Sequence, residues 1–141
     1  MADPRDIFDL TGRVACVTGA SSGLGRRAAV VLASAGARVV GVARRAEALD
    51  SLTSEIGARA AAVVADVADR DAIPTLAKAI SAPFGSPDIL IHAAGINTRQ
   101  AADDVTPEGW DQTVALNITA PFFLSQALVP AMKSKGWGRI V

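Results

Sequence analysis

The stretch TGASSGLG, residues 18–25, sets glycines between an apolar run and an Ala/Leu-rich segment. They fall at Gly19, Gly23 and Gly25, a GxxxGxG spacing that differs from the common GxGxxG. Between a strand and a helix, glycines let the backbone approach a ligand, and the free N–H groups of the helix N-terminus attract anions. The pattern predicts that the pyrophosphate of a dinucleotide binds here; a glycine-rich turn without a ligand is the alternative. No GxxxxGK[ST] sequence occurs, so a nucleoside triphosphate loop is not expected.

Apolar runs and helix-forming segments alternate along the chain and would position this loop. The predicted strands are 13–18, 37–43, 58–65 and 87–95, and the predicted helices between them are 24–36, 46–57 and 69–80. Pro74 is tolerated only in or near the first turn of its helix. Alternating strands and helices predict right-handed crossovers and a parallel sheet. Because the strands are apolar almost throughout, helices should cover both faces, giving a doubly wound α/β fold.

The end of the chain predicts one more helix and the beginning of a fifth strand. Thr106 has the residue type of an N-cap, and Pro107 suits the first helical position. The helix should run to about Lys135 and end at Gly136. It is apolar almost all round from 114 to 132, which predicts burial on more than one side. The segment 139–141 would then begin a strand.

Composition excludes several classes of protein. At 141 residues, with 50% hydrophobic and 20% charged residues, the chain predicts a single globular domain. A formal net charge of zero argues against a nucleic-acid or membrane-surface partner. No secretory signal is apparent, and no stretch approaches the roughly 20 apolar residues that span a bilayer. Cys16 is the only cysteine, so neither a disulfide framework nor a cysteine-rich metal site is expected, and a cytoplasmic location is predicted.

The glycine loop resembles the coenzyme loop of the short-chain dehydrogenases/reductases. Three further stretches agree with that family in order and spacing: ADV at 65–67, HAAG at 92–95 and LN at 116–117. The resemblance covers nearly the whole chain from Asp9. It implies a Rossmann-like fold and an oxidoreductase that transfers hydride between NADP(H), or NAD(H), and a small-molecule carbonyl or alcohol. The stretch 94–105 weakly resembles sugar-acid and polyol dehydrogenases of the family.

The resemblance also implies roles for residues along the coenzyme. Ser21, Ser22 and Leu24 would join the glycines in holding the phosphates. Asp66 would receive the adenine amino group, although an acid that caps the next helix is an equal alternative.

The Val67 backbone would lie beside that Asp66 carboxylate. Ala94 and Gly95 are the small residues that let the backbone approach the coenzyme ribose in the family. His92 replaces an asparagine that ties the sheet together there, and we expect it to be structural rather than a general base.

Coenzyme preference depends on the end of the second predicted strand. An acid there would bind the ribose hydroxyls of NAD, whereas a cation accepts the 2′-phosphate of NADP. Ala43 is followed by Arg44, whose guanidinium suits a phosphate, and then by Arg45. We therefore expect NADP, with NAD possible, and two solvated arginines at the start of a surface helix are the alternative.

The family's catalytic groups are incompletely represented. Asn117 sits in the middle of a predicted helix, where asparagine is a poor helix former, and its family counterpart holds a water in a proton relay. The serine after the fifth strand and the YxxxK pair have no match, since the sequence contains no tyrosine. The sequence therefore predicts an incomplete domain over 1–141, truncated within the fifth strand.

Two functions remain open on this basis. The first is an inactive fragment of an NAD(P)-dependent dehydrogenase. The second is a dinucleotide-binding or interaction module that works without turnover. In either case the apolar helix at 107–135 predicts a homo-oligomer, because the family pairs this helix with a second subunit.

Overall fold

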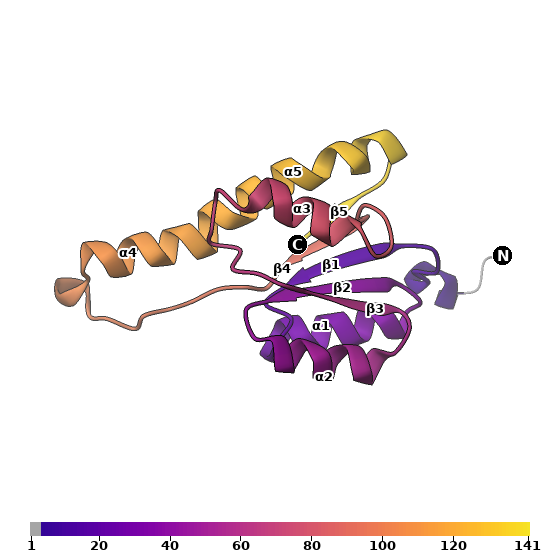
Figure 1. The fold of residues 1–141 in the computed structure, drawn as a ribbon, viewed down its shortest axis with the longest axis horizontal. Coiled ribbons are helices and arrows are strands. Elements are labelled where there is room, and N and C mark those ends of the chain that lie inside the picture. The colour runs from indigo at the N-terminus through magenta and orange to yellow at the C-terminus, as the bar shows by residue number, and fades with distance from the viewer. Residues whose placement is uncertain (1–3) are drawn as a thin grey trace.

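A parallel five-stranded sheet forms the centre of the molecule in the computed structural model, which describes residues 4–141 (Figure 1). Its strands are β1 (Val14–Thr18), β2 (Arg38–Ala43), β3 (Ala60–Val64), β4 (Ile89–His92) and β5 (Arg139–Ile140). They lie in the order β3-β2-β1-β4-β5. The chain moves outward from β1 in one direction and then returns to its other side at β4. A crevice therefore opens between β1 and β4 at the carboxyl ends of the strands, where open α/β sheets bind ligands.

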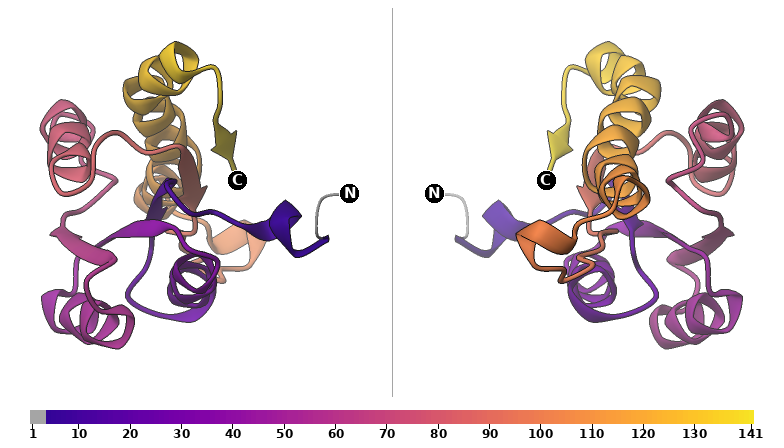
Figure 2. Two further views of the ribbon diagram at one scale, coloured as in Figure 1. Left: turned by 90° about the vertical axis from the view of Figure 1, so that its right-hand side faces the viewer. Right: turned by 90° about the vertical axis from the view of Figure 1, so that its left-hand side faces the viewer.

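Helices cover both faces of this sheet. They are α1 (Gly23–Ser34), α2 (Ala46–Ile56), α3 (Ile73–Ser81), α4 (Pro107–Val114) and α5 (Ala120–Lys135), with short 3-10 turns at Pro4–Phe8 and Ala102–Asp104. The end-on views place α1 and α2 on one face and α3 and α5 on the other (Figure 2). The predicted doubly wound α/β fold is thus confirmed.

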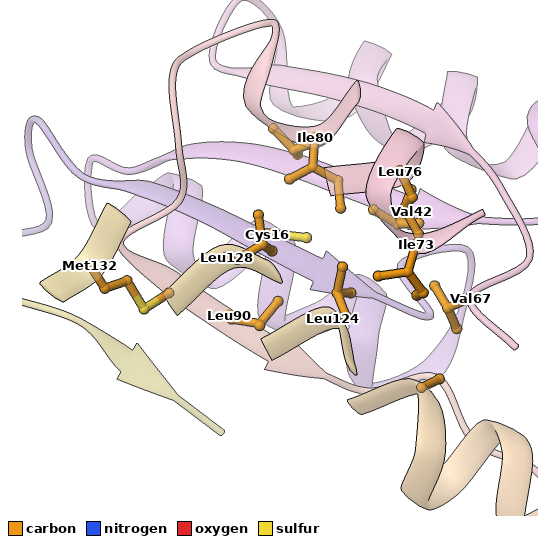
Figure 3. Close-up of a cluster of buried hydrophobic side chains, with 12 residues drawn as sticks. Cys16, Val42, Val67, Ile73, Leu76, Ile80, Leu90, Leu124, Leu128 and Met132 are labelled. Carbon is orange, nitrogen blue, oxygen red and sulfur yellow. The ribbon is translucent and has the colours of Figure 1, made fainter. Parts of the chain in front are cut away.

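Successive side chains of the strands point alternately into two hydrophobic cores, one on each face of the sheet. On β1, Ala15 and Val17 pack with α1 and α2, whereas Cys16 between them packs with α3 and α5. This alternation follows from the two-residue period of a strand. Figure 3 shows the second core, in which Leu124, Leu128 and Met132 of α5 lie over Cys16 and Leu90, beside Ile73, Leu76 and Ile80 of α3.

The start of α3 differs from the sequence expectation. The helix begins at Ile73 rather than at residue 69, so Pro74 lies in its first turn, where a missing N–H costs no hydrogen bond. The preceding residues form turns, in which the Asp69 carboxylate accepts the N–H groups of Asp71 and Ala72. The expected strand at 87–95 is also shorter, since β4 comprises Ile89–His92.

The last helix has the expected ends but not the expected regularity. Thr106 caps it by accepting the Gly109 N–H at 3.1 Å, and Gly136 ends it with a φ of 67°. Between α4 and α5, however, residues Ala115–Thr119 form a π-helix. A π-helix inserts an extra residue into the turn and is frequent at functional sites, and this one contains Asn117.

This continuous helix is as long and as apolar as the sequence predicts. By length and composition alone, Pro107–Lys135 is sufficient to cross a membrane, since an 18-residue window within it has a mean hydropathy of 1.4. The expectation that no segment approaches a membrane span is therefore wrong for this helix. A core helix that is mostly buried passes the same test, but only 17% of this window is buried, with Ala120, Leu124 and Leu128 packed against α3 and the sheet.

Candidate functional site

A cleft of about 490 Å³ lies at the carboxyl edge of the sheet, at the crevice between β1 and β4. Every coenzyme-binding residue expected from the sequence lines it: Gly19, Ser21, Ser22, Gly23, Leu24, Gly25, Arg44, Asp66, Val67, Ala94 and Gly95. The fold thus brings together segments that are up to 76 residues apart, as in the hydrogen bond from the Ala94 N–H to Thr18 Oγ1.

The three glycines of the loop are needed for different reasons. A Cβ on Gly19 would lie 2.7 Å from the backbone of Ala93 and Ala94, and a Cβ on Gly25 would collide with the Gly19 carbonyl. These two glycines therefore let the chain pack against itself. Gly23 has a φ of +57° and open space where a Cβ would lie, so this position leaves the floor of the cleft free for a ligand.

The N-terminus of α1 is open to an anion. The N–H groups of Gly23, Leu24 and Gly25 have no acceptor among residues 4–141. Ser22 is the N-cap residue, yet its side chain makes no capping hydrogen bond, and the first turn contains no acid. Free N–H groups and a positive dipole end therefore meet at the cleft, as a pyrophosphate requires.

Two arginines at the end of β2 give the cleft its positive charge. Arg44, the cation expected from the sequence, lines the cleft and makes no hydrogen bond or ion pair with the described residues. Arg45 also lines it, and its Nη2 donates to Ser21 Oγ at 3.1 Å and to Ser22 Oγ at 2.9 Å. This contact of Arg45 could not be predicted from the sequence, since adjacency to Arg44 gives no sign of a bond to Ser21 and Ser22, 24 and 23 residues earlier in the chain.

Asp66 follows β3 and lines the cleft. Its Oδ1 accepts the Ala68 N–H at 3.0 Å, which fixes a turn rather than the start of α3. Asp69, rather than Asp66, accepts backbone N–H groups directly before α3, so the alternative that Asp66 caps this helix is wrong. The second carboxylate oxygen of Asp66 has no hydrogen bond to the described residues and is free to receive an amino group.

Asn117 lies outside the lining of the cleft and acts on it through Ile96. Its Nδ2 donates to the Ile96 carbonyl at 2.8 Å, and its Oδ1 accepts the Ile96 N–H at 3.0 Å. A Cβ on Gly95 would come within 3.3 Å of the same Oδ1. Gly95 is therefore small to admit the Asn117 side chain, a reason that the sequence did not reveal.

His92 ties β4 to the helix layer. Its ring Nε2 lies 2.9 Å from Ser125 Oγ on α5, and its backbone N–H donates to the Val141 carbonyl at 2.8 Å. Burial lowers the pKa of His92, since the charged imidazolium is disfavoured away from water. His92 is absent from the lining of the cleft, in agreement with the structural role expected for it.

No other reactive group competes with this site in the part of the chain that the structure describes. Burial raises the pKa of Cys16 to about 12, so its thiol is not a nucleophile at neutral pH. No group of three or more His, Cys, Asp or Glu side chains within residues 4–141 could hold a metal ion.

Known proteins match this chain over almost all of its length. A family model described as short chain dehydrogenase matches residues 13–141. The D-threitol dehydrogenase of Mycolicibacterium smegmatis is 37% identical over 95% of this chain and 53% of its own length. The gluconate 5-dehydrogenase of Gluconobacter oxydans is 42% identical over 96% of this chain and 54% of its own length. The chain thus spans about half the length of the curated relatives it matches.

A solved structure gives the same result for the fold. The 3-oxoacyl (acyl-carrier-protein) reductase from Agrobacterium tumefaciens C58, with NADP bound, superposes with a TM-score of 0.90 at 28% identity. The match covers 98% of this chain and 54% of the reductase. Fold, loop and sequence agree, and the chain belongs to the short-chain dehydrogenase/reductase family of oxidoreductases.

Proposed function

We propose that these residues bind NADP(H) and form the coenzyme-binding part of an enzyme that interconverts a small-molecule carbonyl compound and its alcohol. The observation that carries this proposal is the open N-terminus of α1, where unpaired N–H groups face a cleft flanked by two arginines. When bound, the coenzyme supplies or accepts the hydride. The related reductase that was solved with NADP bound supports this choice of coenzyme.

Each wall of the cleft would hold one part of the coenzyme. The pyrophosphate would lie on the N–H groups of Gly23, Leu24 and Gly25, where a negative charge is most stable. The Ser21 and Ser22 hydroxyls are positioned to add hydrogen bonds, and Gly19 and Gly25 keep the loop closely packed behind them.

The adenine and ribose would occupy the remaining walls. Asp66 would accept the adenine amino group through its free carboxylate oxygen, beside the Val67 backbone. The segment of Ala94 and Gly95 would lie against a ribose, since neither residue has a side chain large enough to exclude it. Asn117 would keep that segment in place through Ile96 and hold the water that the family resemblance implies.

A preference for NADP over NAD rests on Arg44. Its guanidinium is free, lines the cleft and follows Ala43, where an acid would repel a 2′-phosphate. Calorimetric titration with both coenzymes tests this choice. We expect tighter binding of NADP(H), and loss of that preference in Arg44→Ala. Equal or tighter binding of NAD(H) by the unaltered chain would contradict it.

We further propose that the 141-residue chain does not turn over carbonyl substrates. The acid–base tyrosine that the family resemblance implies is not among its residues, since the sequence contains no tyrosine. Loss of a general acid costs about 10²–10⁴-fold in rate, before any cost of misplaced substrate. NADPH oxidation followed by absorbance, with a panel of ketones and aldehydes, provides the measurement. Turnover by the purified chain would show that another group supplies the proton.

The same absence of tyrosine keeps a second function open, a module that binds the dinucleotide without catalysis. Genomic sequence beyond the codon for Val141 separates the two. A continuing reading frame that encodes a serine and a YxxxK pair supports the enzyme, and a stop codon supports the module. In both cases we expect a cytoplasmic homo-oligomer that associates through 107–135.

A further inference from the structure

Ser22 occupies the N-cap of α1 but does not cap it. At an N-cap, a serine hydroxyl ordinarily accepts the N–H of the second or third helical residue, which here are Leu24 and Gly25. The Ser22 hydroxyl instead accepts a hydrogen bond from Arg45 Nη2 at 2.9 Å, and the same nitrogen reaches Ser21 Oγ at 3.1 Å. The N–H groups of Leu24 and Gly25 therefore remain without an acceptor in residues 4–141.

Arg45 thus joins the start of α2 to the loop before α1, in addition to the bonds of Arg26 to Ala48, Ser51 and Glu55 that link the two helices further along. It lies at the start of α2, where it is the N-cap residue, and it holds the loop that leads into α1. Arg44, its neighbour, makes no such contact and faces the same cleft. The two adjacent arginines therefore provide a natural pair for comparison, with equal charge and different partners.

We propose that Arg45 is a positioning residue that keeps the N-terminus of α1 open for the pyrophosphate. The inference rests on the proposed coenzyme function and deepens it. Without the guanidinium, the Ser22 hydroxyl turns back to cap Leu24 or Gly25 and competes with the phosphate for the same N–H groups. If this closed form holds about nine molecules in ten, the apparent affinity for the coenzyme falls about tenfold.

The proposed role predicts that substitutions of Arg45 and Arg44 differ in which coenzyme they weaken. The pyrophosphate is common to NAD and NADP, so loss of Arg45 weakens both to a similar degree. The 2′-phosphate belongs to NADP alone, so loss of Arg44 weakens NADP and leaves NAD unchanged. A second phosphate-binding cation at position 45 would instead resemble Arg44 in this comparison.

Calorimetry with NAD and NADP on the 141-residue chain makes the comparison. We expect Arg45→Ala to weaken both coenzymes by about tenfold, and Arg44→Ala to weaken NADP only. Arg45→Lys, which keeps a donor within reach of the hydroxyls, should retain most of the affinity. In the double variant Arg45→Ala/Ser22→Ala no hydroxyl remains to close the helix end, so NAD affinity should recover from the level of Arg45→Ala to that of Ser22→Ala alone, which lacks the same hydroxyl. An Arg45→Ala effect confined to NADP, no effect at all, or no recovery in the double variant would each overturn the proposal.

Amide hydrogen exchange provides a readout without coenzyme. In Arg45→Ala the Leu24 or Gly25 amide should exchange several-fold more slowly, because the Ser22 hydroxyl now accepts its hydrogen, and the double variant should restore fast exchange. If the amides respond but the unaltered chain binds neither coenzyme, the coenzyme function fails while the positioning role of Arg45 holds. If both coenzymes bind and the amides do not respond, the role of Arg45 fails alone.

Discussion

The side-chain amide of Asn117 pairs with both backbone groups of Ile96, donating to its carbonyl at 2.8 Å and accepting its N–H at 3.0 Å. These bonds resemble those of a neighbouring strand, and they hold the segment that leaves β4 against the cleft. The π-helix Ala115–Thr119 carries the asparagine that makes them. Asn117 therefore joins the last helix to the wall of the coenzyme cleft.

Replacement of Asn117 should loosen this wall. We expect Asn117→Ala to lower the free energy of unfolding by about 1–2 kcal/mol, the usual cost of losing two hydrogen bonds that water partly replaces. NADP affinity should fall as well, because Gly95 and Ile96 line the cleft. Urea unfolding and calorimetry measure the two effects. Asn117→Asp, which keeps the acceptor for the Ile96 N–H, serves as the intermediate control, and an Asn117→Ala variant equal to the unaltered chain in both assays would refute the role.

The glycines of the loop should separate stability from binding. Gly19→Ala places a Cβ 2.7 Å from the backbone of Ala93 and Ala94, at a φ of +67°. We expect it to destabilise the fold by several kcal/mol, about the cost of strong overpacking with backbone strain. Gly23→Ala meets open space, so it pays only for its φ of +57°, about 1 kcal/mol, but it should lower coenzyme affinity more than tenfold. Thermal unfolding with and without NADP distinguishes them, and equal stability losses would contradict this division.

The pH dependence of stability should contain a contribution from His92. In the folded protein its pKa lies below the ordinary 6.5 because the ring is half-buried. Between these two pKa values the unfolded chain binds a proton that the folded chain does not, so stability increases with pH in this window. The contribution is fully present above about pH 6.5 and decreases as the solution becomes more acidic.

His92→Gln removes the titrating group and is the matched control. Below about pH 6.5, the free energy of unfolding of this variant should depend less on pH than that of the unaltered chain. Urea unfolding at a series of pH values measures the difference. Identical acid limbs for the two proteins would mean that His92 does not carry this effect.

The last helix should drive self-association. Its side chains Trp110, Ile118 and Phe122 are 63%, 64% and 61% exposed, although each is large and apolar. Each forgoes about 1.5–3 kcal/mol while it remains in water, against a typical domain stability of roughly 5–15 kcal/mol. We therefore expect the 141-residue chain to associate or to bind a hydrophobic dye at low micromolar concentration. Light scattering and sedimentation provide the measurement.

Substitutions on the same helix localise that association. Ile118→Lys with Phe122→Lys should reduce the associated fraction and the dye signal, whereas Gln126→Lys, at a polar exposed position of the same helix, should change neither. A compact monomer that unfolds cooperatively and does not bind the dye would contradict an association surface on this helix.

The overall architecture could be predicted from the sequence, whereas two local features, the start of α3 and the π-helix, could not. The fold and the composition of the cleft follow from strong patterns, namely apolar strands that alternate with helices and a glycine loop between the first two elements. The start of α3 at Ile73 could not be predicted, because the Asp69 carboxylate accepts two backbone N–H groups and thereby stabilises a turn where the sequence predicts the first turn of the helix. The π-helix was missed because no propensity distinguishes it from an α-helix of the same composition.

Two contacts of the site depend on the tertiary structure and could not be predicted. The bond between Arg45 and Ser22 joins residues 23 positions apart, and the pair of Asn117 and Ile96 joins residues 21 apart. Neither distance follows from a helical or strand period. The sequence predicts burial on more than one side of the apolar helix. Leu116, Phe123 and Val129 are partly buried there, but Ile118 and Phe122 remain exposed.

The central claim is that a dinucleotide binds on the open N-terminus of α1. The most direct test is to follow the backbone amide signals by NMR during a titration of the 141-residue chain with NADP. We expect the largest shifts at Gly23, Leu24 and Gly25, with smaller shifts at Arg44 and Asp66. No saturable shifts, or shifts that leave the α1 N-terminus unchanged, would contradict it.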